Sequence, residues 1–519
     1  MTAAEVRTAL RTDMVRGSLW TLLSAVLSMP VAFVANLIVV RSLGTVEYGR
    51  FAFYVATYGV LVTLVNAGVS DATVQWLAGA HARGDREQSA ALVRTCAGYH
   101  VFIEAPVVAV VTVLLLHDAP LGFVLAAVVA NFVTMAIGTS TVVLTATARN
   151  AFAARVSLVM TLAAQATVAA TAVVQHEGSA AWALRAVALA IGPCLAVAGV
   201  AGHLRPMLFR PRLPRRLPAG FLSYGVAAWS SALVTMLLLD ESEIFVLRWY
   251  DDLAAVAVFA VLTTVANQLT VPMDSLMAPL VPIAAGLVGS APHLASPALD
   301  RSLRVTALSA TLTCGVALPA AAELLPAVFG GRYGHDTAAF VALATLSCLS
   351  SAAGPLRAFA FATRQVVGVL RINVLGLAVD AALALSLIPA YGLRGAVLAL
   401  LVGQALSIVL VLRLVAKVLE RRPGSVLVEV RAAVVGVVAG VAAVLAAADV
   451  DGTGVRTVVG VVVGAVIVLG SLRLLPGLRM NAGDEAVIVA GLPPRLGRAF
   501  VTTTRLLPLV RHEPGVGAV

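Results

Sequence analysis

Long apolar runs separated by short polar gaps make up most of this chain. About fourteen such runs lie between Gly17 and Leu475, and most are about 20 to 30 residues long. A helix of about 20 apolar residues is long enough to cross the roughly 30 Å hydrocarbon core of a bilayer. The pattern therefore predicts an all-α integral membrane protein with about fourteen transmembrane helices. The first run is too long for a signal-peptide core and lacks a convincing cleavage site, so we expect it to remain as the first helix.

The predicted spans fall into two sets of six, followed by two more. In order they are Gly17–Val40, Phe51–Ala80, Ala90–Leu116, Leu121–Ala146, Ala151–Val174, Ala181–Ala201, Phe221–Leu247, Leu253–Val281, Val305–Phe329, Thr337–Ala360, Val366–Pro389, Ala396–Val418, Val430–Ala447 and Arg456–Leu475. We predict a helical bundle in residues 1–204, a basic linker in 205–220, a second bundle in 221–420, two extra helices in 421–478 and a cytoplasmic tail in 479–519.

Short turn sequences in the two sets resemble each other. The stretch Ala148-Arg149-Asn150 precedes the fifth span, and Ala362-Thr363-Arg364-Gln365 precedes the eleventh. Six spans are an even number, so both sets would enter the membrane in the same direction. Parallel repeats of this kind occur in transporters, whose substrate sites lie at the repeat interface. We therefore expect two parallel-repeat bundles around a central cavity, although chance echoes in sequence rich in Ala, Val and Leu are the alternative.

Basic residues gather in every second gap. On the side that holds the N-terminus lie 29 of the 36 Lys and Arg residues. Cytoplasmic loops carry such an excess, because basic residues resist translocation across the membrane. The distribution predicts a multi-pass protein of the plasma membrane with both termini in the cytoplasm.

Composition excludes several other classes of protein. Charged residues make up 12% of the chain and hydrophobic residues 60%, whereas a soluble domain has about 25% charged residues. The net charge of +10 lies in short loops rather than in a continuous basic patch, which argues against nucleic-acid binding. The four cysteines are scattered within apolar runs, and the chain has neither an HExxH nor a Walker-type ATP motif. We therefore expect no metal, no cofactor and no enzymatic chemistry.

Two turn motifs resemble those of a known transporter family. One is Arg41-x-Leu43-Gly44-x-x-Glu47-Tyr48-Gly49 after the first span, and the other is Pro389-x-Tyr391-Gly392-x-x-Gly395-Ala396 after the eleventh. With Gly68 and Asn373, they resemble the polysaccharide flippases (Wzx-like) of the multidrug/oligosaccharidyl-lipid/polysaccharide exporter (MOP) superfamily. The chain departs from the family at Ala257-Val258-Phe259, where a Gly-Tyr pair is frequent. The resemblance implies a MATE/MurJ-like fold.

The resemblance also implies a function. The protein would flip a polyprenyl-diphosphate-linked oligosaccharide from the cytoplasmic to the outer leaflet by alternating access, for export of lipopolysaccharide or exopolysaccharide. Its partners would be membrane lipid, the lipid-linked glycan, Na⁺ or H⁺, and polysaccharide assembly enzymes. The alternatives are a drug or small-molecule cation antiporter of the same superfamily, or a lipid II flippase. A membrane glycan polymerase or glycosyltransferase is disfavoured, because the longest outer gap has only about ten residues to hold a catalytic site.

Charges inside apolar runs are the candidate site residues, because a charge in hydrocarbon needs a partner or a water-filled cavity. The candidates for ion coupling are the carboxylates Glu104, Asp380, Asp274 and Asp71. The candidates for binding the substrate diphosphate through bidentate hydrogen bonds are Arg41, Arg149, Arg357 and Arg364. The alternative is that Arg149 and Arg364 only anchor cytoplasmic loops, that Arg41 snorkels to lipid headgroups, and that Asp71 caps a helix.

Overall fold

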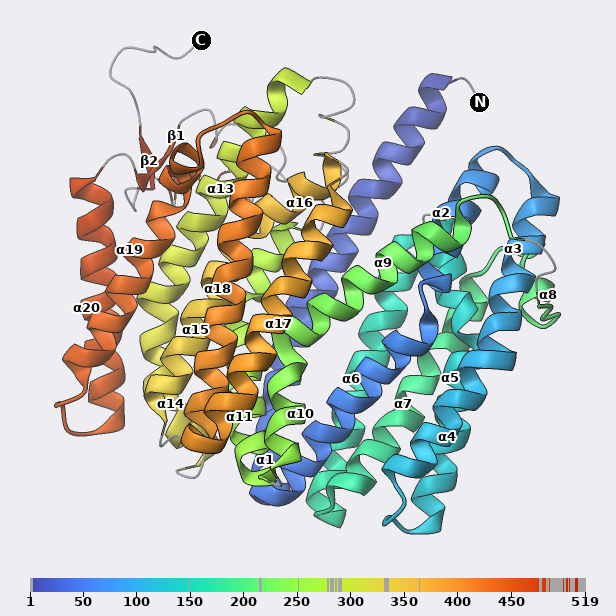
Figure 1. The fold of residues 1–519 in the computed structure, drawn as a ribbon, viewed down its shortest axis with the longest axis horizontal. Coiled ribbons are helices and arrows are strands. Elements are labelled where there is room, and N and C mark those ends of the chain that lie inside the picture. The colour runs from blue at the N-terminus through green and yellow to red at the C-terminus, as the bar shows by residue number, and fades with distance from the viewer. Residues whose placement is uncertain are drawn as a thin grey trace. The chain divides into compact units, whose positions relative to one another are not determined.

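The computed structural model is almost entirely helical (Figure 1). It describes residues 3–475 except 148, 214–216, 251, 278–279, 281–283, 285–286, 288–291, 331–335 and 364, together with 478–481, 485, 498, 501–502, 504 and 509–511. The chain divides into two compact units. Unit 1 comprises residues 1–260 and 388–393, and unit 2 comprises residues 261–387 and 394–519. The domain boundaries expected from the sequence stay a prediction.

Unit 1 is a helical bundle, and its described residues include two π-helical turns. Its elements are α1 (Ala3–Asn66), α2 (Val69–Ala82), α3 (Arg86–Tyr99), η1 (His100–Glu104), α4 (Ala105–Leu115), α5 (Leu121–Ala146), α6 (Asn150–Gln175), α7 (Gly178–Gly199), α8 (Arg205–Leu208), α9 (Phe221–Met236), η2 (Leu237–Glu241) and α10 (Ser242–Trp249). Helix α11 (Leu253–Met277) begins in unit 1 and continues into unit 2.

Unit 2 contains a 3-10 turn, a third π-helical turn, eight α-helices among the described residues and one short strand pair. Its elements are η3 (Pro292–Leu294), α13 (Ala295–Leu312), η4 (Thr313–Ala317), α14 (Leu318–Phe329), α15 (Thr337–Ala352), α16 (Gly354–Ala362), α17 (Val366–Tyr391), α18 (Leu393–Val418), α19 (Pro423–Ala447) and α20 (Thr453–Leu474). The strands β1 (Met480–Asn481) and β2 (Val510–Arg511) pair in parallel, and Leu478 and Val510 belong to the same buried apolar cluster as Ala432 and Ala433 of α19.

Twelve of the described helices are long and apolar enough to cross a membrane. The number is smaller than the expected fourteen for two local reasons. Helix α1 contains the whole of the first predicted span and about half of the second, which are joined through a kink at Gly44, where φ is 72°. The seventh predicted span is divided into α9, η2 and α10, of which α9 alone is apolar but short. The fold class is confirmed, and the total of fourteen spans stays a prediction.

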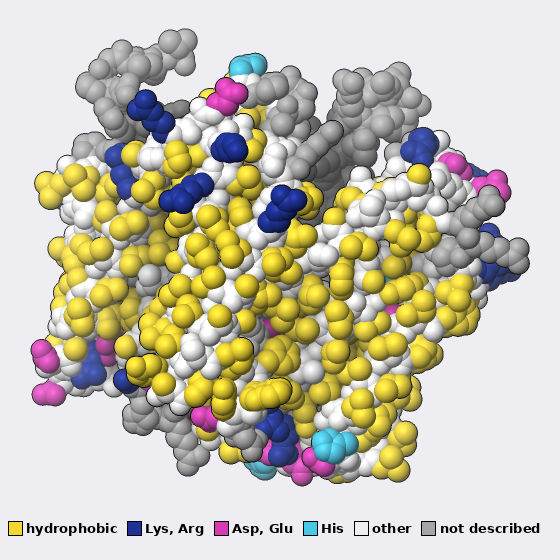
Figure 2. All heavy atoms as spheres, in the orientation of Figure 1, with side chains coloured by type: hydrophobic (Ala, Val, Ile, Leu, Met, Phe, Trp, Pro, Cys, Tyr) yellow, Lys and Arg dark blue, Asp and Glu magenta, His cyan; other side chains and the backbone are white. Residues whose placement is uncertain are grey.

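Apolar side chains cover the helices of unit 2 in mid-length, and charges gather at the helix ends (Figure 2). At one end Arg421 pairs with Asp300 and Arg304 with Glu429, at 3.0 Å for the second pair. These contacts fix the start of α13 beside the turn between α18 and α19. A charged side chain that enters hydrocarbon loses its hydration, which is costly. Apolar mid-sections with charged ends therefore suit helices that cross a bilayer.

Candidate functional site

A break between α1 and α2 forms one side of a polar network in unit 1. Ala67 and Gly68 both have positive φ, 48° and 75°, so the helix stops at Asn66 and restarts at Val69. Carbonyl groups at the break find side-chain donors. The Tyr99 hydroxyl donates to the Val65 carbonyl at 2.6 Å, which satisfies a group that the interrupted helix leaves without its usual partner.

Helix α9 packs directly on this break. The Trp229 indole N–H donates to the carbonyl of Thr63 at 2.9 Å. A Cβ atom added to Gly68 would lie only 1.9 Å from the carbonyl oxygen of Gly225, so the two backbones touch. The rings of Trp76 in α2 and Phe221 in α9 pack edge to face, with centroids 5.5 Å apart. Glycine is therefore required at position 68 both by its backbone conformation and by its neighbour.

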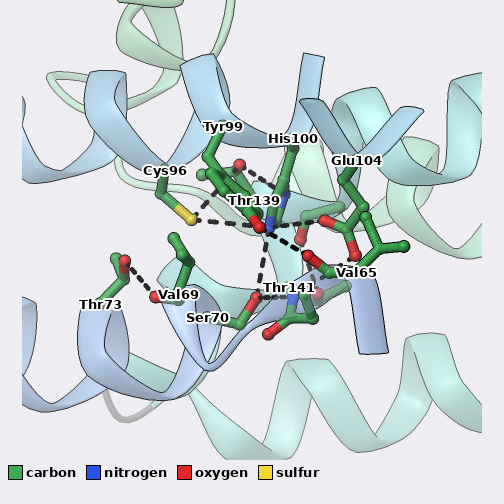
Figure 3. A network of polar contacts seen from close by, with 12 residues as sticks. Val65, Val69, Ser70, Thr73, Cys96, Tyr99, His100, Glu104, Thr139 and Thr141 are labelled. Atoms are coloured by element: carbon green, nitrogen blue, oxygen red, sulfur yellow. Dashed lines mark hydrogen bonds and ion pairs between the residues drawn. The ribbon is translucent and has the colours of Figure 1, made fainter. Parts of the chain in front are cut away.

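The π-helical turn η1 places a buried histidine and a buried carboxylate opposite the break (Figure 3). His100 Nε2 lies 3.3 Å from Glu104 Oε2, and both side chains are less than 5% exposed. Asn66 Nδ2 donates to Ser70 Oγ at 2.8 Å and to Glu104 Oε1 at 3.4 Å. Ser70 Oγ is 3.2 Å from His100 Nε2. At the other nitrogen of the imidazole, Thr139 Oγ1 of α5 is 3.0 Å from Nδ1.

This network joins three regions that are distant in sequence: the α1–α2 break, the α3–η1 helix and α5. It lies near mid-length of the apolar span Arg86–Leu115, where water is normally excluded. A buried ionisable pair in such a place is costly unless every partner is hydrogen-bonded, and here the hydroxyl and amide groups supply those bonds. The arrangement can bind and release a proton, or it can keep His100 and Glu104 as a permanent ion pair.

The predicted candidate Asp274 lies in a second polar group, within unit 2. Its carboxylate accepts hydrogen bonds from Thr270 at 2.9 Å and from Ser351 at 2.8 Å, and one helical turn along α15 Ser347 donates to Asn267 at 3.1 Å. We name Asn267, Asp274, Ser347 and Ser351 the α11–α15 polar track. Asp274 and Asn267 are exposed although α11 and α15 are apolar helices. Asp274 follows the apolar stretch Leu253–Val271, and an exposed carboxylate beside such a stretch is stable only where it meets water or a polar ligand.

Arg357 and Asp380 also lie in unit 2. Arg357 follows the break between α15 and α16, is half-buried, and interacts electrostatically with Asp274. Asp380 of α17 is fully buried, and a Cβ atom added to Gly403 of α18 would lie 2.6 Å from the Asp380 Cβ. Because residue 403 is glycine, helix α18 can approach the turn of α17 that carries Asp380. A side chain at position 403 would prevent this close approach. Of the predicted candidates, the structure brings together Asp274 and Arg357.

The remaining candidates lie near the ends of helices. Arg41 is exposed shortly before the Gly44 kink, and Asp71 is exposed in the first turn of α2. Arg149 is exposed and donates from Nη1 to the carbonyl of Gly199 at 2.7 Å, so it caps the end of α7. Arg364 lies outside the described residues. The roles assigned to all eight candidates stay predictions.

Sequence analysis missed most of the network around Glu104. Single polar residues such as Asn66, Ser70 and Thr139 are common in membrane helices, and nothing in their spacing marks them. His100 carried a usable signal, because residues four apart on a helix face the same side and Glu104 is four residues later. The proline at 106 is a second sign that this part of the helix is irregular.

Unit 2 also contains a partly open cavity of about 760 Å³ lined by residues of α14, α15, α18, α19 and α20. Its lining is mostly apolar. It contains one ion pair, in which Arg456 Nε lies 3.5 Å from Glu323 Oε2, with the carboxylate side chain only 9% exposed. Because α19 and α20 form part of its wall, the cavity depends on the two helices that follow the second bundle.

Residues 14–285, just over half of the sequence, match the family described as polysaccharide biosynthesis protein. The chain belongs to this family. The match begins before the first span and covers the whole of the α1–α2 break, η1 and the start of the α11–α15 polar track. It confirms the resemblance to polysaccharide exporters that the turn motifs indicated. No curated protein sequence matches this family member.

Solved structures show the fold of this polysaccharide biosynthesis protein. It is similar to lipid II flippase MurJ in an inward closed conformation, with a TM-score of 0.60, 10% identity, and coverage of 87% of this chain and 98% of that chain. It is also similar to a mutant of the Vibrio cholerae MATE transporter VcmN, with a TM-score of 0.56, 16% identity and coverage of 80% and 98%. The MATE/MurJ-like fold is therefore confirmed, and the protein is a multi-pass membrane protein.

Proposed function

We propose that this protein is a flippase that moves a polyprenyl-diphosphate-linked oligosaccharide from the cytoplasmic to the outer leaflet by alternating access. Membership of the polysaccharide biosynthesis family carries the proposal. In this reading the protein lies in the plasma membrane with both termini in the cytoplasm, and it works beside polysaccharide assembly enzymes. No covalent chemistry is required, because transport needs only two conformations of the protein that differ in which side the substrate reaches.

The chemistry of the α11–α15 polar track supports a sugar-bearing substrate. Amide, carboxylate and hydroxyl groups are the side chains that hydrogen-bond sugar hydroxyls, and the track presents all three within apolar helices. Arg357 beside Asp274 supplies a cation of the kind that binds phosphate oxygens in a bidentate manner. A polar head group that crosses the membrane needs such replacements for its lost water, whereas its polyprenyl tail can remain in lipid.

The test is the location of lipid-linked glycan in the source organism after deletion of the gene. We expect lipid-linked oligosaccharide to accumulate in the cytoplasmic leaflet and surface polysaccharide to fall, with restoration by the full-length gene. The variant Arg357→Lys keeps the charge but loses bidentate geometry, so it should restore export only partly. Arg394→Lys, at the exposed ion pair with Asp336, is the matched control and should restore export fully.

Two other substrates are distinguished by the same strain. A lipid II flippase shares this fold, and if lipid II were the substrate here, lipid II would accumulate and the surface glycan would be kept. A MATE-type antiporter would leave glycan export intact and change sensitivity to organic cations. Normal surface polysaccharide in the deletion strain, with no lipid-linked oligosaccharide accumulating, would overturn the proposal.

A further inference from the structure

The His100–Glu104 pair can exist in two protonation states without losing its hydrogen bonds. With neutral His100, the Nε2–H donates to Glu104 and the Thr139 hydroxyl donates to Nδ1. With a proton added at Nδ1, that nitrogen becomes the donor to Thr139 Oγ1. The Thr139 hydroxyl hydrogen can then turn to the Cys96 sulfur, which lies 3.7 Å from Oγ1. A side chain with two alternative partners lets the ring gain or lose a proton in place.

The two states differ in net charge, which makes proton occupancy sensitive to the surroundings. With one proton, the pair is neutral overall, as an imidazolium with a carboxylate or as an imidazole with a carboxylic acid. Without that proton, the pair carries one negative charge among apolar helices, and burying an unbalanced charge costs several kcal/mol. The closed surroundings seen here, with both side chains less than 5% exposed, therefore favour the protonated pair. Loss of the proton requires water to reach the site.

Other ionisable groups around the pair come from three helices. Tyr58 of α1 and Cys96 and Tyr99 of α3 lie within electrostatic range of Glu104, and Arg185 of α7 lies within range of Tyr58. From α2 and α5 the residues bonded to the pair are hydroxyl-bearing, Ser70 and Thr139. Among these described groups Arg185 is the basic one, and its electrostatic partner is Tyr58 rather than Glu104. The proton on His100–Glu104 is thus the direct means of balancing the carboxylate charge.

The same hydrogen bonds tie the proton to the α1–α2 break. Asn66 is the last residue of α1 and bonds Glu104, whereas Ser70 is in the first turn of α2 and bonds His100. A change in the charge of the pair alters the bonds on both sides of Ala67 and Gly68, whose backbone torsions set the angle between the two helices. Breaks of this kind absorb the torsional change when helices move.

We propose that the His100–Glu104 pair, bonded to Asn66 and Ser70 across the α1–α2 break, is a proton-binding site that couples proton occupancy to the angle between α1 and α2. Proton binding is a property of the site itself, while its role in driving transport rests on the proposed flippase function. One proton enters the site and is shared between Glu104 and His100. The same proton leaves at a later step of the transport cycle. The coupling ion is therefore H⁺ rather than Na⁺.

The test measures charge movement without any substrate. The full-length protein is reconstituted in liposomes of neutral lipid on a solid-supported membrane, and the pH is stepped at constant Na⁺. We expect the pH step to give a transient current in the wild type, because protons enter a buried site. Exchange of K⁺ for Na⁺ at constant pH should give no current. Glu104→Gln should lose the pH-step current. Glu87→Gln makes the same chemical change at an exposed position of the same helix and should keep it.

A second variant keeps the test informative if Glu104→Gln does not reconstitute as a monodisperse protein. His100→Gln leaves the carboxylate but removes the group that shares the proton, so the midpoint of the current against pH should move by at least about half a unit. A pH-step current that persists in Glu104→Gln, an unchanged midpoint in His100→Gln, or a current on the Na⁺ step would overturn the proposal. A strain that lacks the gene but exports glycan normally would instead refute the flippase function and leave the proton site standing.

Discussion

The contact between the α1–α2 break and α9 can be tested by adding one methyl group. In Gly68→Ala the residue would keep φ near 75°, a conformation that costs an L-residue about 1–2 kcal/mol. The new Cβ would also meet the Gly225 carbonyl oxygen at 1.9 Å, far inside van der Waals contact. Forcing packed elements apart in this way typically costs about 1–3 kcal/mol more. We therefore expect Gly68→Ala to lower the free energy of unfolding by about 2–5 kcal/mol.

The matched control is Gly84→Ala, in the turn between α2 and α3. Gly84 has nearly the same torsion, φ of 72°, but no atom lies within 4 Å of the position that its Cβ would occupy. This variant should lose only the torsional part, about 1–2 kcal/mol. The difference between the two variants isolates the cost of the close approach to α9.

The assay is thermal unfolding of the purified full-length proteins in detergent, followed by tryptophan fluorescence. Trp229 of α9 reports locally, because its indole N–H is bonded to the Thr63 carbonyl at the break. We expect Gly68→Ala to melt at a clearly lower temperature than Gly84→Ala, with altered Trp229 emission at temperatures below the transition. Equal melting temperatures for the two variants would show that α9 is not held against the break, and the reasoning about this contact would be wrong.

Three further outcomes follow from contacts in each unit. Gly403→Ala should destabilise the protein by about 1–3 kcal/mol, because its methyl group would press on α17. The control Gly470→Ala places a methyl group in open space on α20, so this variant should unfold at or slightly above the wild-type temperature. Arg456→Met should destabilise by about 1–3 kcal/mol because it leaves the Glu323 carboxylate buried alone, and adding Glu323→Gln should restore most of that loss in a double-mutant cycle. Arg149→Ala should cost about 1 kcal/mol by removing the bond to the end of α7, and if the residue only caps, glycan export in the deletion strain should stay normal.

Hydrophobic length and charge position predict the helices well, because the bilayer imposes both. The predicted span at 121–146 coincides with helix α5, and those at 366–389 and 396–418 differ by only a few residues from helices α17 and α18. The α1–α2 break was not predictable in the same way. Ala67 is a non-glycine residue with positive φ, and it holds this conformation because Trp229, Tyr99 and Gly225 meet the backbone around it. Such contacts arise from tertiary packing, which the local sequence does not encode.

The candidate site shows the same division. Glu104 and Asp274 stand out in the sequence because a carboxylate in an apolar run is rare. Their partners do not, because Asn66, Ser70 and Ser351 are ordinary polar residues until the fold places them within hydrogen-bond distance. The sequence therefore names the charged group in each cluster, and the tertiary structure supplies the groups that make it tolerable in the membrane.

Both units contain a π-helical turn that is followed by a proline, but the two turns have different contacts. In unit 1 the π turn η1 begins at His100 and is followed by Pro106, and in unit 2 the π turn η4 begins at Thr313 and is followed by Pro319. The equal spacing from turn to proline supports a repeat, since proline six residues on removes the same backbone donor in both helices.

The residues inside the two π turns then decide what each turn does. The turn in unit 1 carries His100 and Glu104, whereas the turn in unit 2 carries Cys314 and Gly315. A Cβ atom added to Gly464 of α20 would lie 1.8 Å from the Gly315 carbonyl oxygen, and one added to Gly440 of α19 would lie 2.2 Å from that of Cys314. Small residues at both partners allow this close approach. The π turn that in unit 1 holds ionisable groups therefore serves in unit 2 as the surface on which the two extra helices pack, and a side chain as large as histidine or glutamate there would exclude them.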